Sequence, residues 1–559
     1  MQNSKFEMQN LFNPKTVWIF LTAIVLLALV LRLWQLGSIP PSPDWDEAAF
    51  GYDAYSIMHT GRDEYGKFLP VVLRSFDDYK PALYAYAVIP AELVFGVNIF
   101  AVRFPSALFG VLTVLATYFL VEELTRKKSL ALLSSFLLAI SPWSIQFSRV
   151  GFESNVGVAM NAFTVLFFIK GMKKPWYFCL ATFAASLNIY VYQSEKVFTP
   201  LLLLVLIFVY RRELWRVSRK YILAALLVGG IVILPMFVAI VTDKNVLLRV
   251  KGTSAFLDTT TFLQDDVTKL TTDHQNHDYL GLLLDNRRFV YTRAILDGYL
   301  AHYDMNWLFI KGDIARHHAP GMGLIYLVSL PFLLMGIYMV LFRRTGFDIS
   351  SQARNLLLLW YLVTAIPASI TSGVPHAVRT LNFLPVVEIF VAVGLLGALM
   401  YIKGKRVRTS VFILILAVYI FNVSYYLDQY FVQLNYYDSG QWQYGYAQAV
   451  QYVESVQDTY HKIIVSGKAP LDKSYMFFLF YMKYPPAEYQ KVGQFSSGGF
   501  AETHAYGKFQ FHEIDWKKES SEHNVLFVGN PGEFPANVNG VVKTINGLDG
   551  TPAIEIVSN

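Results

Sequence analysis

The residues best suited to chemistry lie just after the first apolar segment of the chain. A Pro-rich turn at 40–43 precedes Asp46 and Glu47, and a helix is expected to begin there. Because the helix dipole favours carboxylates in the first turn, one interpretation is that both acids only cap this helix. The alternative is general-base chemistry, since a carboxylate partly removed from water beside a membrane has a raised pKa. We expect Asp46 to be the base and Glu47 to orient either Asp46 or the acceptor.

The rest of this segment is unusually polar for chain that lies between apolar runs. Charged groups near a membrane interior are costly and are retained mainly where they have a function. Tyrosines offer stacking faces, although aromatic residues are also enriched at membrane interfaces for anchoring alone. The candidates for substrate binding here are Tyr52, Tyr55, Asp78 and Tyr79, with Lys80 as a phosphate-binding cation.

Three short segments each hold a lone cation at the end of an apolar run. These cations are Arg149, Lys196 and Arg379. Any one of them alone is explained by a side chain that reaches the lipid headgroups. Their joint placement on the side that also holds the acids favours an anionic ligand such as a phosphate. Glu153 and His376 lie close to two of these cations and are further substrate-binding candidates.

Another polar segment, which contains Arg316, His317 and His318, directly precedes an apolar run. Adjacent histidines rarely point the same way on regular structure, and no third metal ligand is evident nearby in the sequence. We therefore expect a loop that closes over substrate, using Arg316 and one histidine such as His317, in preference to a metal pair. The alternative is that these residues only anchor the segment at the membrane interface.

The elements that must position these residues are membrane helices. Of 559 residues 54% are hydrophobic and only 16% are charged, against about 25% charged in average proteins. This composition excludes a cytosolic enzyme, a disordered chain and a fibrous repeat. The single cysteine, Cys179, excludes internal disulfides and cysteine zinc sites. A spanning helix needs about 20 apolar residues, and eleven runs qualify: 17–36, 100–121, 129–143, 156–170, 176–192, 197–210, 221–242, 321–342, 355–371, 380–402 and 409–427.

The distribution of basic residues predicts the orientation of these spans. If the short apolar run 82–97 lies at the interface, one set of loops holds 18 Lys and Arg residues and the other only three. By the positive-inside rule the N-terminus is then cytoplasmic and the C-terminus extracytoplasmic, in a multi-pass protein of the plasma (inner) membrane. The net charge of +6 is explained by this orientation, so no nucleic-acid partner is expected. The loops that hold these 18 basic residues are 122–128, 170–174, 211–220, 343–354 and 403–408.

Two domains are expected. Residues 1–427 form the membrane module, with large external segments at 37–99 and 243–320. Residues 428–559 change character, because short apolar strands such as 462–466 alternate with stretches of helical periodicity. This alternation predicts a small extracytoplasmic α/β domain.

At these residues the chain resembles a known family. The Pro-rich turn with Asp46 and Glu47, the Lys80-Pro81 pair and the run 100–110 (FAVRFPSALFG) resemble the protein O-mannosyltransferase and aminoarabinose-transferase group of polytopic GT-C glycosyltransferases. The resemblance covers residues 17–210 well, and 211–427 mainly by topology. It implies inverting transfer of a sugar, by default mannose, from a polyprenyl- or dolichyl-phosphate carrier to a protein or glycolipid acceptor. The family's acid falls on Asp46, its lysine on Lys80 and its second-loop basic residue on Arg149.

The resemblance also bears on cofactors and on alternative functions. Oligosaccharyltransferase relatives carry a metal-binding acidic pair in the second external loop, where this chain has only Glu153. We therefore expect no cofactor and no catalytic metal, although Asp44-Trp45-Asp46 could supply half of a divalent-cation site. A transporter or lipid flippase is the second interpretation. It is disfavoured because transporters usually place ionisable groups in the middle of their spans.

Overall fold

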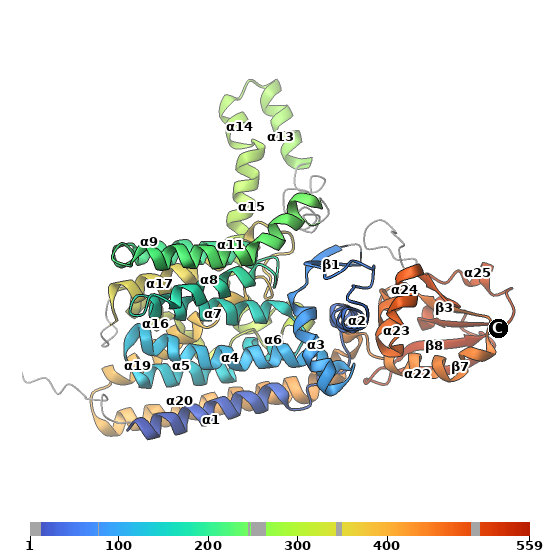
Figure 1. The fold of residues 1–559 in the computed structure, drawn as a ribbon, viewed down its shortest axis with the longest axis horizontal. Coiled ribbons are helices and arrows are strands. Elements are labelled where there is room, and N and C mark those ends of the chain that lie inside the picture. Colours follow the sequence, from blue (N-terminus) through green and yellow to red (C-terminus); the bar gives the residue numbers. More distant parts are fainter. Residues whose placement is uncertain (1–12, 77, 244–245, 247–263, 343–348, 493–503) are drawn as a thin grey trace, which may run out of the picture.

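The computed structural model describes residues 13–76, 78–243, 246, 264–342, 349–492 and 504–559. Most of the chain forms a bundle of long helices that run side by side, and a smaller sheet domain lies at one end of the bundle (Figure 1). The bundle helices are α1 (Pro14–Leu33), α4 (Ile99–Thr125), α5 (Lys128–Ile140), α6 (Pro142–Ser148), α7 (Glu153–Gly171), α8 (Tyr177–Asn188), α9 (Glu195–Val209), α10 (Arg211–Leu214), α11 (Arg219–Thr242), α16 (Leu330–Leu341), α17 (Ser351–Val363), α18 (Ile366–Ser369), α19 (Val386–Tyr401) and α20 (Lys405–Asp428).

Every predicted span contains a helix, but the helices differ in length. Among the described residues six are long and apolar enough to cross a membrane, or seven if α5 and α6, which meet at a 57° bend, form one span. The helices α8, α9, α16 and α17 have only 12 to 15 residues. At 1.5 Å per residue these reach about 20 Å, short of the roughly 30 Å hydrocarbon core. The count of eleven spans and the interfacial placement of 82–97, which holds α3 (Leu83–Phe95), stay predictions.

Small residues allow the bundle helices to approach closely. A Cβ added to Gly336 of α16 would lie 1.8 Å from the Phe390 carbonyl oxygen of α19, and one added to Gly394 would lie 2.0 Å from the Phe332 carbonyl oxygen. Close backbone contact replaces the hydrophobic driving force that is missing between helices in lipid. Larger side chains at either glycine would force α16 and α19 apart.

The elements next to the candidate site gather at one end of the bundle. They are α2 (Trp45–Thr60), the antiparallel hairpin of β1 (Val72–Ser75) and β2 (Asp78–Pro81), and α3. Further along the chain, α13 (Gln264–Gln275), α14 (Tyr279–Leu284) and α15 (Arg287–Ala301) project away from the bundle (Figure 1). A short π-helix (Trp307–Lys311) and a 3-10 turn (Ala315–His317) lead back to α16.

The C-terminal part is an α/β unit, as predicted. Its six strands have the order β4-β5-β3-β6-β8-β7, in which β3 is parallel to β5 and β6 and the other pairs are antiparallel. The predicted strand 462–466 is β3. The strands are β3 (Lys462–Ser466), β4 (His504–Tyr506), β5 (Phe509–His512), β6 (Val525–Gly529), β7 (Val541–Asn546) and β8 (Pro552–Ser558), and the helices α21 (Leu434–Tyr437), α22 (Tyr446–Val456), α23 (Ser474–Met482), α24 (Pro486–Val492) and α25 (Trp516–Glu519).

Helix α2 is enclosed between the bundle and the sheet domain (Figure 1). A Cβ on Gly51 would lie 2.4 Å from the Phe480 ring of α23 and 2.8 Å from Val102 of α4, so only glycine fits there. The Tyr52 hydroxyl donates to the Tyr484 carbonyl (3.0 Å), and the Gln490 amide donates to Ser56 Oγ (3.0 Å). The orientation of α2 is therefore set from both sides.

Candidate active site

The first turn of α2 brings together the two residues on which the sequence prediction rests most heavily. The Lys80 ammonium of β2 donates to Asp46 Oδ1 at 3.1 Å. Lys80 is 2% exposed, with its Nζ 3.9 Å from the Phe50 ring centroid, whereas Asp46 is 36% exposed. The hairpin thus delivers a buried cation to a carboxylate that solvent or substrate can reach.

Glu47 has surroundings unlike those of its neighbour. It is fully buried and forms a bidentate ion pair with Arg103 of α4, with Nε to Oε1 at 2.7 Å and Nη2 to Oε2 at 2.9 Å. Its carboxylate also accepts the Gly151 N–H (2.7 Å) and, as part of a capping box, the Asp44 N–H (3.1 Å). Because these four contacts occupy it, Glu47 fastens α2 to α4.

Asp44 and Arg316 form a second pair at the start of α2. Asp44 Oδ1 caps the helix by accepting the Glu47 N–H (2.9 Å), and Asp44 Oδ2 lies 3.5 Å from Arg316 Nη1. Burial, followed by the nearby charge of Glu47, raises the pKa of Asp44 to about 7 against the opposing effect of Arg316. The Arg316 guanidinium also lies 4.2 Å from the Trp45 ring centroid. The predicted substrate-binding Arg316 therefore reaches the same turn as Asp46.

His317 and His376, far apart in the sequence, meet beside this turn with ring centroids 5.2 Å apart. His317 Nδ1 lies 3.0 Å from Asp313 Oδ2, and burial is the main cause that lowers the pKa of both histidines. Asp313, His317 and His376 each place a ligand atom within 4.8 Å of the others, so this group could hold a metal ion. The candidate metal ligands are therefore His317, Asp313 and His376, and not the two adjacent histidines. His318 Nε2 donates to the Asp313 carbonyl (2.5 Å), and His318 is not one of the three.

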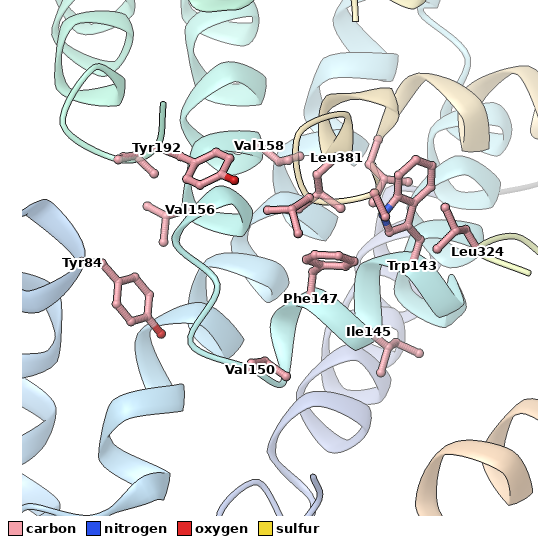
Figure 2. Close-up of a cluster of buried hydrophobic side chains, with 14 of the residues drawn as sticks. Tyr84, Trp143, Ile145, Phe147, Val150, Val156, Val158, Tyr192, Leu324 and Leu381 are labelled. Atoms are coloured by element: carbon pink, nitrogen blue, oxygen red, sulfur yellow. The ribbon is translucent and has the colours of Figure 1, made fainter. Parts of the chain in front are cut away.

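A buried apolar cluster supports the loops that present these side chains. Phe147 and Trp143 of α6 lie within it (Figure 2), and the Trp143 backbone N–H donates to the Leu324 carbonyl (3.1 Å). The Phe147 ring centroid lies 5.6 Å from that of His317. Helix α6 therefore packs against the histidine loop, which is the segment 312–318 that holds His317 and His318.

The predicted phosphate-binding Arg149 lies apart from this turn. It is fully buried, donates to the carbonyls of Leu31 (3.0 Å) and Ile39 (3.1 Å), and stacks 4.6 Å from the Phe431 ring centroid. These contacts join α1, the Pro-rich turn and the segment after α20. These contacts stabilise the packing around Arg149, and its phosphate-binding role stays a prediction.

The other candidates are distributed around the same end of the bundle. Arg379 donates to Thr371 Oγ1 and the Ser372 carbonyl (both 2.6 Å) in its own loop, and Lys196 is partly buried in the first turn of α9. Tyr52 and Tyr55 face each other on α2 with ring centroids 6.2 Å apart. The Tyr79 carbonyl accepts from Gln193 (3.1 Å), Asp78 pairs with Ser75 in the hairpin, and Glu153 begins α7.

Three residues of the site were missed or underrated by the sequence analysis. Arg103 could have been noticed, because a cation within an apolar span needs a buried partner. Asp53 lies about two helical turns after Asp46 on α2. Burial, with the charge of Asp63, raises the pKa of Asp53 to about 8, while Lys80 opposes the rise. Lys473 comes from the sheet domain and lies 4.5 Å from the Trp45 ring centroid. No local pattern marks it.

Both the fold and part of the sequence are similar to those of known proteins. ArnT of Cupriavidus metallidurans bound to undecaprenyl phosphate has the same fold, with a TM-score of 0.54 at 13% identity over 96% of this chain and 98% of ArnT. Residues 79–238, which include Lys80, Arg103 and Arg149, match the family model of dolichyl-phosphate-mannose-protein mannosyltransferases. This chain has the fold of the GT-C membrane glycosyltransferases, and its residues 79–238 match one of their families. These matches confirm the resemblance and the fold class that the sequence predicted. They also confirm the prediction of a glycosyltransferase.

Two structures of the Archaeoglobus fulgidus oligosaccharyltransferase AglB are also similar to this GT-C enzyme. AglB in complex with an inhibitory peptide and a dolichol-phosphate gives a TM-score of 0.49 at 14% identity over 83% of this chain. AglB tethered with an acceptor peptide containing the NVT sequon gives 0.50 at 15% identity over 85%. The GT-C enzyme spans only 63% and 60% of these AglB chains. No curated protein matches it in sequence.

Proposed function

We propose that this GT-C enzyme transfers a sugar, by default mannose, from a polyprenyl-phosphate carrier to an acceptor hydroxyl at the α2 end of the bundle. Two observations support the donor class. The similar ArnT structure is bound to undecaprenyl phosphate, and the matched family is named for dolichyl-phosphate-mannose. The family name and the peptide-tethered AglB favour a protein acceptor, with a glycolipid as the alternative.

The observation that carries the proposal is the contact between the partly exposed Asp46 and the buried Lys80. In the proposed reaction Asp46 takes the proton of the acceptor hydroxyl as its oxygen attacks the anomeric carbon. The bond from that carbon to the carrier phosphate oxygen breaks, and its electron pair leaves with the phosphate. Lys80 and Arg316 are placed to hold the charge that develops there. A single displacement inverts the anomeric configuration.

The Asp46–Lys80 pair also suggests the order of events. Before donor binds, Lys80 holds Asp46 in position. A donor phosphate that binds Lys80 takes the place of Asp46 on this cation, and Asp46 then becomes available to the acceptor hydroxyl. Glu47 has a positioning role, because Arg103 and Gly151 occupy its carboxylate. No soluble cofactor takes part.

The membrane environment completes the proposal. The carrier's polyprenyl chain and the surrounding membrane lipids contact the apolar helices of the bundle. The excess of basic residues in alternate loops supports a cytoplasmic N-terminus and an extracytoplasmic site in the plasma (inner) membrane.

Replacement of the base tests the mechanism. Asp46→Asn keeps the size of the side chain and should lower turnover of a polyprenyl-phosphate-sugar donor about 10²–10⁴-fold, with donor binding largely retained. Lys80→Gln should weaken donor binding as well as turnover, because the phosphate is charged before and during departure. Glu513→Gln, which alters a largely exposed acid of the sheet domain, is the matched control. If Asp46→Asn turned over the donor at nearly the wild-type rate, Asp46 would only stabilise the first turn of α2 and would not be the base.

A further inference from the structure

The sheet domain contributes a cation to the first turn of α2. Lys473, the residue before α23, places its ammonium 4.5 Å from the Trp45 ring centroid and 5.8 Å from that of Phe76. Its side chain is only 11% exposed and is paired with Asp472 at 2.7 Å. Trp45 is the residue directly before Asp46, so a residue from the C-terminal part of the chain reaches the same helical turn as the proposed base.

Two aromatic rings connect Lys473 to the other cations of the site. Arg316 lies 4.2 Å from the centroid of the same Trp45 ring, and Lys80 lies 5.8 Å from the centroid of the same Phe76 ring. The two charges at the Trp45 ring are at most about 9 Å apart, close to the span of a phosphate with a hydrogen bond on either side. The two at the Phe76 ring are at most about 12 Å apart. Three cations from three separate segments therefore converge on one turn.

The sheet domain also contacts α2 at places that do not involve Lys473. The sheet domain already contacts α2 through neutral groups: the Tyr52 hydroxyl on the Tyr484 carbonyl, the Gln490 amide on Ser56, and the Phe480 ring against Gly51. Like charges held close together at low exposure repel one another, so each cation needs an anion beside it. Among the described residues these anions are carboxylates: Asp46 for Lys80, Asp44 for Arg316 and Asp472 for Lys473.

We propose that Lys473 is a third cation for the donor phosphate, so that the C-terminal domain completes the donor site. This inference rests on the proposed function. Lys80, Arg316 and Lys473 then surround the leaving phosphate from the hairpin, the histidine loop and the sheet domain. Each can exchange its carboxylate partner for a phosphate oxygen, which leaves Asp46 available to the acceptor.

The test compares Lys473→Gln and Lys473→Arg with Lys468→Gln, a half-exposed lysine of the same domain that pairs with Glu513. The readouts are KM for the donor, KM for the acceptor, inhibition by the sugar-free polyprenyl phosphate, and the apparent Tm in detergent. Loss of one charged hydrogen bond should raise donor KM and weaken that inhibition roughly tenfold to a hundredfold. Acceptor KM and Tm should not change. In Lys473→Arg, which keeps the charge, donor KM and inhibition should lie close to the wild-type values. Lys468→Gln should behave as wild type.

Several results would overturn the inference. Unchanged donor KM and unchanged inhibition in Lys473→Gln would show that Lys473 does not bind the phosphate. A lower Tm with unchanged donor KM would make it a docking contact, and a rise in acceptor KM alone would assign its anion to the acceptor. Failure of the proposed function is distinguishable, because wild-type protein would then bind no polyprenyl phosphate in native mass spectrometry.

Discussion

The substitution Glu47→Gln separates a structural role from a catalytic one. In the wild type the carboxylate accepts two hydrogen bonds from Arg103, one from the Gly151 N–H and one from the Asp44 N–H, at 2.7–3.1 Å. Glutamine can accept at only one of the two positions, and its NH₂ group would face donors at the other. Arg103, which is fully buried, would also lose its counter-charge.

The expected magnitude follows from this geometry. Removal of one partner from a buried ion pair costs about 3–5 kcal/mol, because the other charge remains buried and uncompensated. This is a large part of a typical stability of about 5–15 kcal/mol. Glu47→Gln should therefore lower the apparent Tm of detergent-solubilised protein by several degrees and reduce the yield of monodisperse protein. The assay is fluorescence-monitored thermal unfolding followed by size-exclusion chromatography.

Two controls make the experiment decisive. Asp46→Asn changes the adjacent acid, which is partly exposed, so it should lower Tm less than Glu47→Gln does while it lowers turnover. The double substitution Glu47→Gln with Arg103→Gln removes the uncompensated charge and should recover part of the lost stability. A wild-type Tm for Glu47→Gln together with lost turnover would refute our reasoning and make Glu47 a catalytic residue.

Two further predictions concern Asp44 and Arg149. Burial raises the pKa of Asp44 from 3.8 to about 7, so the folded protein holds a proton that the unfolded chain releases between about pH 4 and pH 7, and stability falls as pH rises through this window. Asp44→Asn retains the capping oxygen and should show a smaller fall in Tm from pH 5 to pH 8 than wild type, whereas equal falls would argue that Asp44 is ionised throughout. Arg149→Gln removes a guanidinium that bonds the Leu31 and Ile39 carbonyls and should lower Tm without changing donor KM. A higher donor KM at unchanged Tm would instead support the phosphate-binding role expected from the sequence.

The sequence alone was sufficient for features that depend on composition and local pattern. Each long apolar run forms a helix, because a chain in lipid must satisfy its backbone hydrogen bonds internally. The α/β character of the C-terminal part followed from short apolar strands such as 462–466, which is β3. Asp46 and Lys80 were selected by their motif, and the structure places them 3.1 Å apart.

Tertiary structure decided how neighbouring residues divide their roles. Successive residues on a helix point about 100° apart, so Asp46 faces Lys80 while Glu47 faces Arg103, and no pattern in the sequence says which acid turns inward. The same limit explains why His317 meets Asp313 and His376 in place of His318. Lys473 reaches Trp45 only because the sheet domain packs against α2. Contacts between segments far apart in the chain depend on the packing of whole elements, which local periodicity does not encode.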